Sequence, residues 1–289
     1  NLRVMGVCPS SVLKVVSPHG TIRHDTGRSW AKQAWDATCG DRILRQADLM
    51  VALSEVEARE IRGLFDARNT VLRPDQVHVV PNGVDLSAFA VLPQRIDARR
   101  RFGLSDEGPV VLFFGRLTER KGIRLLIAAF DRAARNLPGA QLLVAGPDHG
   151  AHAAATALVS ARGLDASVRF AGFLSGDDVL AAFAAADVFA LPAIGEGIPL
   201  AALEALASGV PVLLSPDCNL QAAEDGGAVR IVPLDEKAWA DALRELLVDP
   251  GTVASMRTAA RGVAARFTWP SIAADMLHVY ARARGAPRA

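Results

Sequence analysis

The most constraining feature of the sequence is the order of elements between Val188 and Val212. An apolar run of strand length ends at Leu191, a loop with Gly195 and Gly197 follows, and an Ala/Leu-rich segment of helical character is closed by Gly209. Strand, glycine turn, helix and strand in this order are typical of a parallel sheet with helical crossovers. The sequence therefore predicts an α/β fold.

Two glutamates lie in this segment, Glu196 in the turn and Glu204 in the helix. Open parallel sheets bind ligands beyond the carboxyl ends of their strands, so Glu196 is placed where a ligand would lie. Leu200, Leu203 and Leu206 indicate that the helix is largely buried, and buried carboxylates are rare without partners. Glu204 is either a ligand-binding carboxylate or a surface residue on an alanine-rich helix, and the spacing alone leaves both open.

The same segment resembles the signature of the family 4 (group 1) glycosyltransferases, which have the two-domain B-type (GT-B) fold. That signature is E-G-F-G, a second Glu eight positions after the first, and then A-x-A-x-G-x-P-V; the chain reads E-G-I-P, then Glu204 and A-L-A-S-G-V-P-V. The resemblance assigns donor binding to Glu196, Gly197, Ile198, Pro199, Leu200 and Glu204. Pro199 replaces the usual second glycine, and because proline has no amide hydrogen, one backbone contact to the donor is expected to be missing.

A charged turn, G-R-L-T-E-R-K-G, follows the apolar run at 110–114. Its cations Arg116, Arg120 and Lys121 precede or open a helix where the helix dipole is positive, which costs about 0.3–1 kcal/mol per exposed charge. A bound diphosphate explains this placement, because arginine binds its oxygens in pairs and lysine supplies a point charge. A solvent-exposed turn that tolerates the cations is the alternative. The family reads G-R-x4-K-G here, and the resemblance assigns Gly115, Arg116 and Lys121 to the donor diphosphate.

Two further site segments are assigned with the help of the resemblance. A strand expected at 12–16 is followed by S-P-H-G, and a histidine directly after a strand lies at the ligand-binding edge of an α/β sheet. The family has a catalytic histidine here that faces the transferred sugar, and His19 matches it. After a short strand expected at 168–170, the family borders the nucleotide base with backbone groups. The matching residues are Gly172, Phe173 and Leu174.

The remaining elements are predicted from apolar periodicity and turn chemistry. We expect strands at 49–53, 77–80 and 140–145, helices at 28–47, 234–248, 251–266 and 269–284, and a polar loop at 215–227. Ser54 and Glu57 form the S-x-x-E pattern of a capping box at the start of a further helix. An interdomain linker is placed between about Pro81 and Pro109.

The length of 289 residues, with 51% hydrophobic residues and a net charge of +1, suits a globular chain of two domains. We expect an α/β chain of GT-B type with two Rossmann-like domains. Residues 1–92 form a partial N-terminal domain, 93–268 the C-terminal donor-binding domain, and 269–289 a helix that packs back on the N-terminal domain. Because few residues precede the linker and the chain begins with Asn1, the resemblance predicts that the first half of the N-terminal domain is absent.

The distribution of charged residues and cysteines indicates which classes of partner and which redox state to expect. A basic run consists of Arg95, Arg99, Arg100 and Arg101. It is either a solvated helix face or a surface for acidic lipid or an anionic acceptor, so we expect a cytoplasmic chain with peripheral contact at the inner membrane face as an option. Aromatic residues are few and do not interleave with the basic ones, so no nucleic-acid partner is expected. The cysteines lack metal-ligand spacing and indicate reduced thiols: Cys8, Cys39 and Cys218.

The resemblance implies a retaining glycosyltransferase that moves a sugar from a UDP-, GDP- or ADP-sugar to a hydroxyl of a glycan or lipid-linked acceptor. The resemblance implies that Glu204 accepts hydrogen bonds from the ribose and Glu196 from the donor sugar. No Asp-x-Asp motif follows a strand, so neither a metal nor another cofactor is expected. A nucleotide-sugar-binding module without catalysis is the alternative, and phosphorylases and epimerases of the same fold stay open. Nicotinamide dehydrogenases and P-loop nucleotidases are disfavoured because their glycine motifs are missing.

Overall fold

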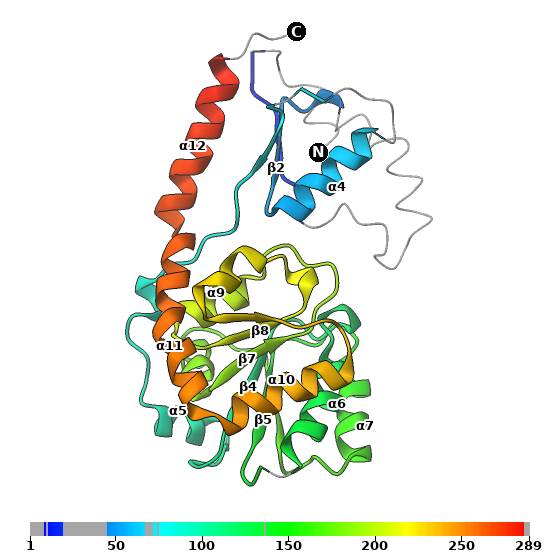
Figure 1. Cartoon of the computed structure of the whole chain (residues 1–289), viewed down its shortest axis with the longest axis vertical. Coiled ribbons are helices and arrows are strands. Elements are labelled where there is room, and N and C mark those ends of the chain that lie inside the picture. Colours follow the sequence, from blue (N-terminus) through cyan, green and yellow to red (C-terminus); the bar gives the residue numbers. More distant parts are fainter. Residues whose placement is uncertain are drawn as a thin grey trace. The chain divides into compact units, whose positions relative to one another are not determined.

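The computed structural model describes residues 9, 11–19, 45–66, 72–73, 75–135 and 137–285. These residues belong to two compact units, each with its own parallel sheet (Figure 1). The smaller unit comprises Asn1–Asn82 and Trp269–Ala289, and the larger comprises Gly83–Thr268. The predicted α/β class is confirmed, while most of the helix predicted at 28–47 lies outside the described residues.

The described part of the smaller unit has three parallel strands in the order β1-β2-β3, at Val15–Val16, Leu49–Ala52 and Val77–Val79. Side chains of β2 alternate between two cores. Met50 and Ala52 pack with α4 (Glu55–Asp66), and Leu49 and Val51 pack with α12 (Trp269–Gly285). Burial on both faces is the usual state of a parallel sheet and explains why L-M-V-A is apolar at every position.

The start of α4 contains the side-chain bond that the S-x-x-E pattern predicts. The Glu57 amide donates to Oγ of Ser54 at 3.1 Å, as in a capping box. The Glu57 carboxylate accepts from the amide of Leu53 at 2.7 Å, one residue before the position that a standard box uses. The pattern is therefore accounted for by helix capping, and no catalytic role is needed to explain it.

The larger unit holds a described sheet of six parallel strands in the order β6-β5-β4-β7-β8-β9. Their bounds are β4 Val110–Phe114, β5 Gln141–Ala145, β6 Val168–Gly172, β7 Val188–Leu191, β8 Val212–Leu214 and β9 Val229–Ile231. The chain adds β5 and β6 on one side of β4 and then returns to add β7, β8 and β9 on the other. This reversal places a topological switch point between β4 and β7, where ligands of such sheets bind.

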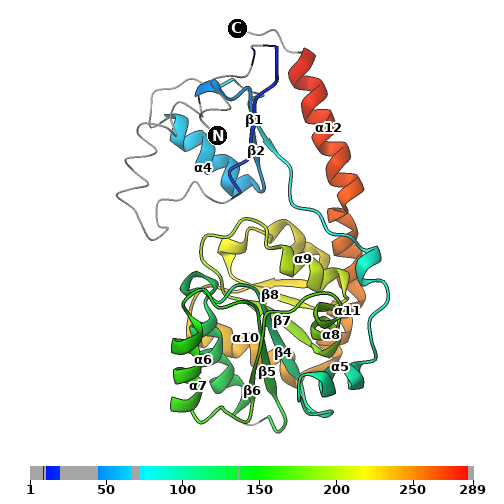
Figure 2. The same cartoon turned by 180° about the vertical axis from the view of Figure 1, so that it is seen from behind.

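Helices cover both faces of this sheet (Figure 1, Figure 2). They are α5 Arg95–Arg101, α6 Ile123–Ala134, α7 His152–Ala161, α8 Asp177–Ala185, α9 Leu200–Ala207, α10 Glu236–Val248 and α11 Pro250–Ala264. On one face α6 packs against α7 and α10, and on the other α5 packs against α8 and α9 against α11. The segment predicted as a linker contributes Phe89 and Ala98 to the core of this unit. None of the described helices combines the length and the apolar composition that a bilayer span requires.

The basic run at the start of this unit is not simply a solvated helix face. Arg99 is only 1% exposed, and it shares the carboxylate of Asp187 with Arg95. Arg100 and Arg101 remain on the surface, each in an ion pair with an aspartate. Arg99 therefore lies in the interior of the unit, and Arg95 reaches the same carboxylate from the surface.

Candidate functional site

The loops that follow β4 and β7 meet at the switch point. Lys121, the last residue of a short 3-10 helix at Glu119–Lys121, lies with its Nζ atom 2.9 Å from Oε2 of Glu196 in the β7–α9 loop. The two side chains are 13% and 23% exposed, so the ion pair is largely shielded yet reachable from solvent. The cationic turn and the glutamate-bearing turn of the sequence thus lie side by side at the carboxyl edge of the sheet.

The contact between the two loops depends on Gly122. Its φ of 72° is in the left-handed region, and a Cβ atom there would clash with the carbonyl oxygen of Pro192. Next to this contact, the Ile194 amide donates to the Arg120 carbonyl at 2.7 Å, and Nη2 of Arg120 donates to the Gly195 carbonyl at 2.8 Å. The glycine of the K-G pair therefore permits the approach that brings Lys121 to Glu196.

A third loop, which follows β8, holds the backbone of the β7–α9 loop around Glu196 in place. The Gly195 amide donates to Oδ2 of Asp217 at 3.0 Å, and the Glu196 amide donates to the Asp217 carbonyl at 3.1 Å. Nδ2 of Asn219 donates to the Glu196 carbonyl at 2.7 Å. Sequence reasoning missed Asp217 and Asn219 as supporting residues, although polar residues that follow a strand at this edge of the sheet are a usable signal.

The floor beneath these loops is buried and chemically inert. The Ser215 hydroxyl donates to the Ala193 carbonyl, and the Cys218 thiol lies 3.6 Å from the Leu191 carbonyl. Burial raises the pKa of the Cys218 thiol to about 11, so the sulfur is protonated at neutral pH and cannot serve as a nucleophile. Cys218 is a free thiol, and the other two cysteines of the chain lie outside the described residues.

The Glu204 carboxylate differs from that of Glu196 in having no partner among the residues that the structure describes. It lies on α9, partly buried, and burial raises the pKa of its carboxyl group. Within the described parts of the chain, no hydrogen bond or ion pair is recorded for this carboxylate. A partly buried carboxylate without a partner is unfavourable for the free protein, and it offers two oxygen acceptors to a ligand with hydroxyl groups.

Helix α9 begins directly after the glutamate loop, with Pro199 as its N-cap. The Pro199 carbonyl accepts from the amides of Ala202 and Leu203 at 3.1 and 3.4 Å. Ile198 and Pro199 are buried and Leu200 is 48% exposed, so the chain emerges from the core as the helix starts. The first amides of a helix lack acceptors within the helix and favour anions.

The other residues assigned to the donor lie on neighbouring strand ends. Gly115 follows β4, and its carbonyl lies so close to Gly146 that a Cβ on Gly146 would clash with it. Arg116 is exposed, and its guanidinium has no recorded partner among the described residues. Gly172 ends β6 and accepts a hydrogen bond from the Gly146 amide at 2.7 Å. The next side chain, Phe173, is 72% exposed, whereas Leu174 beyond it is buried.

Three of the six histidines follow strands, one after β1 and two after β5. His19 lies in the smaller unit, three residues after β1, exposed and with a φ of 50° that is uncommon outside glycine. His149 is exposed, and His152 packs its ring on Phe170 with 5.0 Å between centroids. No group of three or more metal-ligating side chains occurs among the residues that the structure describes.

Two family models match the chain. The model described as Glycosyl transferases group 1 matches residues 94–263, which is more than half of the chain and contains Lys121, Glu196 and Glu204. The chain belongs to the group 1 glycosyl transferases. Residues 7–88 match the model described as Glycosyltransferase Family 4. The family predicted from the E-G and K-G motifs is therefore confirmed.

Curated relatives of this glycosyltransferase chain are longer than it is. A D-inositol 3-phosphate glycosyltransferase of Kineococcus radiotolerans is 34% identical over 260 residues, which cover 84% of this chain and 59% of that protein. The enzyme of the same name from Salinispora tropica is 32% identical over 258 residues, covering 84% and 52%. The chain thus spans a little over half the length of these relatives.

Solved structures share its fold. Sucrose-phosphate synthase from Thermosynechococcus elongatus is similar with a TM-score of 0.80 and 26% identity, over 99% of this chain and 71% of that one. Anabaena Alr3699/HepE in complex with UDP and glucose has a TM-score of 0.79 and 20% identity, over 93% and 71%. These neighbours confirm the predicted GT-B fold class.

Proposed function

We propose that the larger unit binds a nucleotide-diphosphate sugar at the β4/β7 switch point, and that the parent protein transfers the sugar to an acceptor hydroxyl. The observation that carries this proposal is the Lys121–Glu196 pair, held by three loops at the carboxyl edge of the sheet, with the unpartnered Glu204 on the adjoining helix. A donor of this class is supported by the neighbour HepE, which was solved with UDP-glucose.

The diphosphate is assigned to the cationic side of the site. Lys121 would exchange its bond to Glu196 for a phosphate oxygen, and the exposed Arg116 would supply a second, paired contact. The backbone at Gly115 and the first amides of α9 complete the cradle, while Pro199 contributes no amide. Positive charge here stabilises the diphosphate as it leaves, when its negative charge grows.

The two glutamates are assigned to hydroxyl groups of the donor. Glu204 accepts from the ribose, which offsets the cost of its burial, and Glu196 accepts from a sugar hydroxyl once Lys121 has turned to phosphate. The backbone of residues 197–200 lies between them. Gly172, Phe173 and Leu174 border the base, with the exposed Phe173 ring available as an apolar wall.

Transfer is proposed to proceed with retention and without a metal. The bond between the anomeric carbon and the diphosphate oxygen breaks, and the acceptor oxygen bonds to the same face of that carbon. The acceptor proton passes to the leaving phosphate oxygen. The buried Cys218 is protonated, so it does not form a covalent intermediate. His19 of the smaller unit is assigned to the transferred sugar, and the acceptor is a glycan or lipid-linked hydroxyl.

Calorimetry of the whole chain with UDP-glucose, GDP-mannose and ADP-glucose tests the proposal, together with a turnover assay for each. We expect one base to be preferred, and Glu196→Ala to weaken sugar-nucleotide binding more than binding of the free nucleotide. Glu107→Ala, at an exposed position away from the switch point, is the matched control. Failure of all three donors to bind would overturn the assignment. Binding without turnover would favour the alternative of a donor-binding module.

A further inference from the structure

A second charged cluster lies at the opposite edge of the large sheet, where β4 and β7 begin. Asp187 directly precedes β7 and receives three arginines. Its Oδ1 atom lies 2.7 Å from Nη1 of Arg95 and 3.0 Å from Nη2 of Arg257. Its Oδ2 atom lies 2.8 Å from Nη2 of Arg95, 2.9 Å from Nη2 of Arg99 and 2.9 Å from the Val110 amide. A single carboxylate thus serves three guanidinium groups.

The cluster carries more positive charge than Asp187 can neutralise. A carboxylate has about four lone-pair sites, and the contacts already made fill them. Three guanidinium groups against one carboxylate leave two positive charges uncompensated. Burial, followed by repulsion from Arg95, lowers the pKa of Arg99, and burial also lowers the pKa of Arg257. Both directions reflect the cost of holding like charges in a shielded place.

The spare donors belong to two of the three arginines. Arg99 uses four of its five N–H donors, because it also donates to the carbonyls of Ala185, Ser105 and Asp106. Its side chain is buried, so it offers nothing to a solute. Arg257 uses only Nη2, which donates to the Ala186 carbonyl and to Asp187. Nε and Nη1 of Arg257 and Nε of Arg95 have no recorded acceptor in the described part of the chain. The side chains of Arg95 and Arg257 are 47% and 34% exposed, so a solute can reach them.

Arg95 and Arg257 line a pocket of about 400 Å³, here named the Arg95–Arg257 pocket. Asp187 also lines this pocket between the two arginines that it pairs with. The remaining walls are mainly apolar and come from the loop before β4, the end of α10 and the first turns of α11. They include Pro109, Leu246, Leu247, Val253 and Ala254. A cavity of this size with apolar walls and a few convergent polar groups has the usual character of a small-molecule site.

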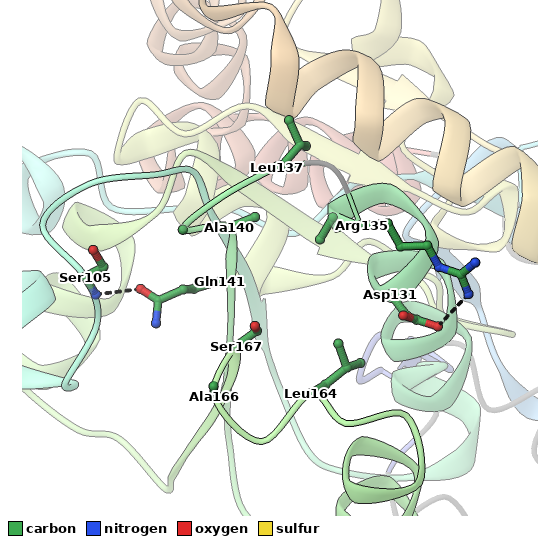
Figure 3. A pocket seen from close by; sticks show the side chains of 11 residues that line it. Ser105, Asp131, Arg135, Leu137, Ala140, Gln141, Leu164, Ala166 and Ser167 are labelled. Atoms are coloured by element: carbon green, nitrogen blue, oxygen red, sulfur yellow. Dashed lines mark hydrogen bonds and ion pairs between the residues drawn. The ribbon is translucent and has the colours of Figure 1, made fainter.

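A second pocket of the larger unit, of about 320 Å³, allows a comparison of the charged side chains in the pocket walls (Figure 3). There the Ser105 amide donates to Oε1 of Gln141 at 2.6 Å. Asp131 pairs with Arg135, as drawn, and with Arg162. Asp131 and Arg135, the two charged side chains in the wall of that pocket, neutralise each other, and Arg162 lies outside the wall. The wall of the Arg95–Arg257 pocket instead has two arginines and one carboxylate.

We propose that the Arg95–Arg257 pocket binds a phosphate monoester whose uncharged part lies against α10 and α11. A phosphate monoester carries about −1.5 to −2 charges at neutral pH and three strong acceptor oxygens, which matches a surplus of two positive charges and the spare guanidinium donors. A carboxylate would neutralise only one. The pocket lies at the amino edge of the sheet and Lys121 at the carboxyl edge, so this inference does not depend on the proposed function.

Calorimetric titration of the whole chain with inorganic phosphate and with glycerol 3-phosphate, at constant ionic strength, tests the proposal. We expect saturable binding that Arg95→Gln and Arg257→Gln each weaken about ten- to a hundredfold, the usual effect of losing a charge-assisted hydrogen bond. Ala254→Trp should block the pocket without changing any charge. Arg244→Gln, at an exposed arginine of α10 outside the pocket, is the matched control and should bind normally.

Three outcomes would overturn the proposal: no saturable binding to the wild-type chain, unchanged affinity in Arg95→Gln and Ala254→Trp, or loss of binding in Lys121→Ala, which would locate the phosphate at the donor site. Arg257→Gln removes a partner of Asp187 and could unfold the unit. Arg95→Gln and Ala254→Trp change more exposed positions. If Arg257→Gln does not fold, these two variants alone test whether phosphate binds in the pocket.

Discussion

The two edges of the six-stranded sheet hold charge in opposite ways. At the amino edge the Asp187 carboxylate is saturated by Arg95, Arg99, Arg257 and a backbone amide. At the carboxyl edge Glu196 has one side-chain partner, Lys121, while Glu204 has none recorded among the described residues. A carboxylate that the fold fully satisfies serves stability, whereas one that it leaves short of partners is available to a ligand.

Helix direction in a parallel α/β sheet explains this division. Helix C-termini return to the amino edge, where their last carbonyls favour cations. Arg99 and Arg257 donate to the carbonyls of Ala185 and Ala186, at the end of α8, and so close that helix while pairing with Asp187. Helix N-termini open at the carboxyl edge and favour anions. Lys121 lies two residues before the start of α6, so it adds positive charge where the fold does not need it.

Asp187→Ala tests whether the charged cluster at the amino edge stabilises the fold, and it is expected to have the largest effect. We expect the free energy of unfolding to fall by about 3–5 kcal/mol, because the change leaves Arg99 buried without its carboxylate. Urea unfolding followed by circular dichroism measures the loss. Glu245→Ala, which breaks a surface pair with Arg230, is the control and should cost less than about 1 kcal/mol. Equal losses in the two variants would show that the amino-edge cluster is no more structural than a surface pair.

Gly122→Ala tests whether the carboxyl edge depends on the close approach of two loops. A left-handed alanine costs roughly 1–2 kcal/mol, and overpacking against the Pro192 carbonyl adds to that, so we expect a loss of about 2–4 kcal/mol. Gly163→Ala is the matched control, because its φ of 67° is similar and nothing lies near its Cβ position. The difference between the two unfolding free energies isolates the contact. Identical values would mean that the loops can separate freely.

Lys121→Ala tests the claim that charge at the carboxyl edge serves a ligand. Affinity for a nucleoside diphosphate should fall about ten- to a hundredfold, because a charge-assisted contact to phosphate is lost, while the unfolding midpoint in urea should change little. Calorimetry and urea unfolding on the same sample give both numbers. Lys237→Ala, at an exposed ion pair on α10, controls for the loss of net charge. A stability loss as large as that of Asp187→Ala would contradict the division between the edges.

The carboxyl edge was the more predictable of the two from sequence. The K-G and E-G turns directly follow apolar strands, and parallel strands bring such turns to one edge of a sheet, so the sequence favours a common edge for Lys121 and Glu196. The amino edge was missed because Arg99 meets Asp187 across 88 positions of sequence, and a basic run has no periodicity that reveals a buried partner. Asp217 was missed because it acts on the backbone of the β7–α9 loop: its Oδ2 atom accepts from the Gly195 amide and its carbonyl accepts from the Glu196 amide.

Strand β9 shows a second limit of sequence reasoning. Its three residues, V-R-I, are too few for a periodic signal, and they follow a polar segment that was expected to be a loop. That segment contains two 3-10 helices, Pro216–Cys218 and Gln221–Gly226. The pairing of β9 with β8 fixes the strand in place, and such pairing is a tertiary property that local sequence does not report.

The smallest expected effect is a gain in stability from Glu204→Gln. Burial raises the pKa of this carboxyl, so the folded chain binds its proton more tightly than the unfolded chain does. The wild-type free energy of unfolding therefore falls as pH rises from the unfolded pKa, about 4.3, through the raised folded value, and stays lower above it. Glutamine cannot ionise, so the variant should be more stable by about 0.5–2 kcal/mol at pH 7.

The pH dependence of this gain separates charge from packing. The difference between Glu204→Gln and wild type should shrink toward zero below about pH 4, where both side chains are neutral. Glu107→Gln, at an exposed position, should show no gain at either pH. Urea unfolding between about pH 3 and pH 8 measures the three chains in parallel. A gain that persists unchanged at low pH would arise from packing. A loss of stability at pH 7 would mean that Glu204 has a stabilising partner in the free protein. The contrast between Glu204 and Glu196 would then disappear, and the ligand assignment of the carboxyl edge depends on that contrast.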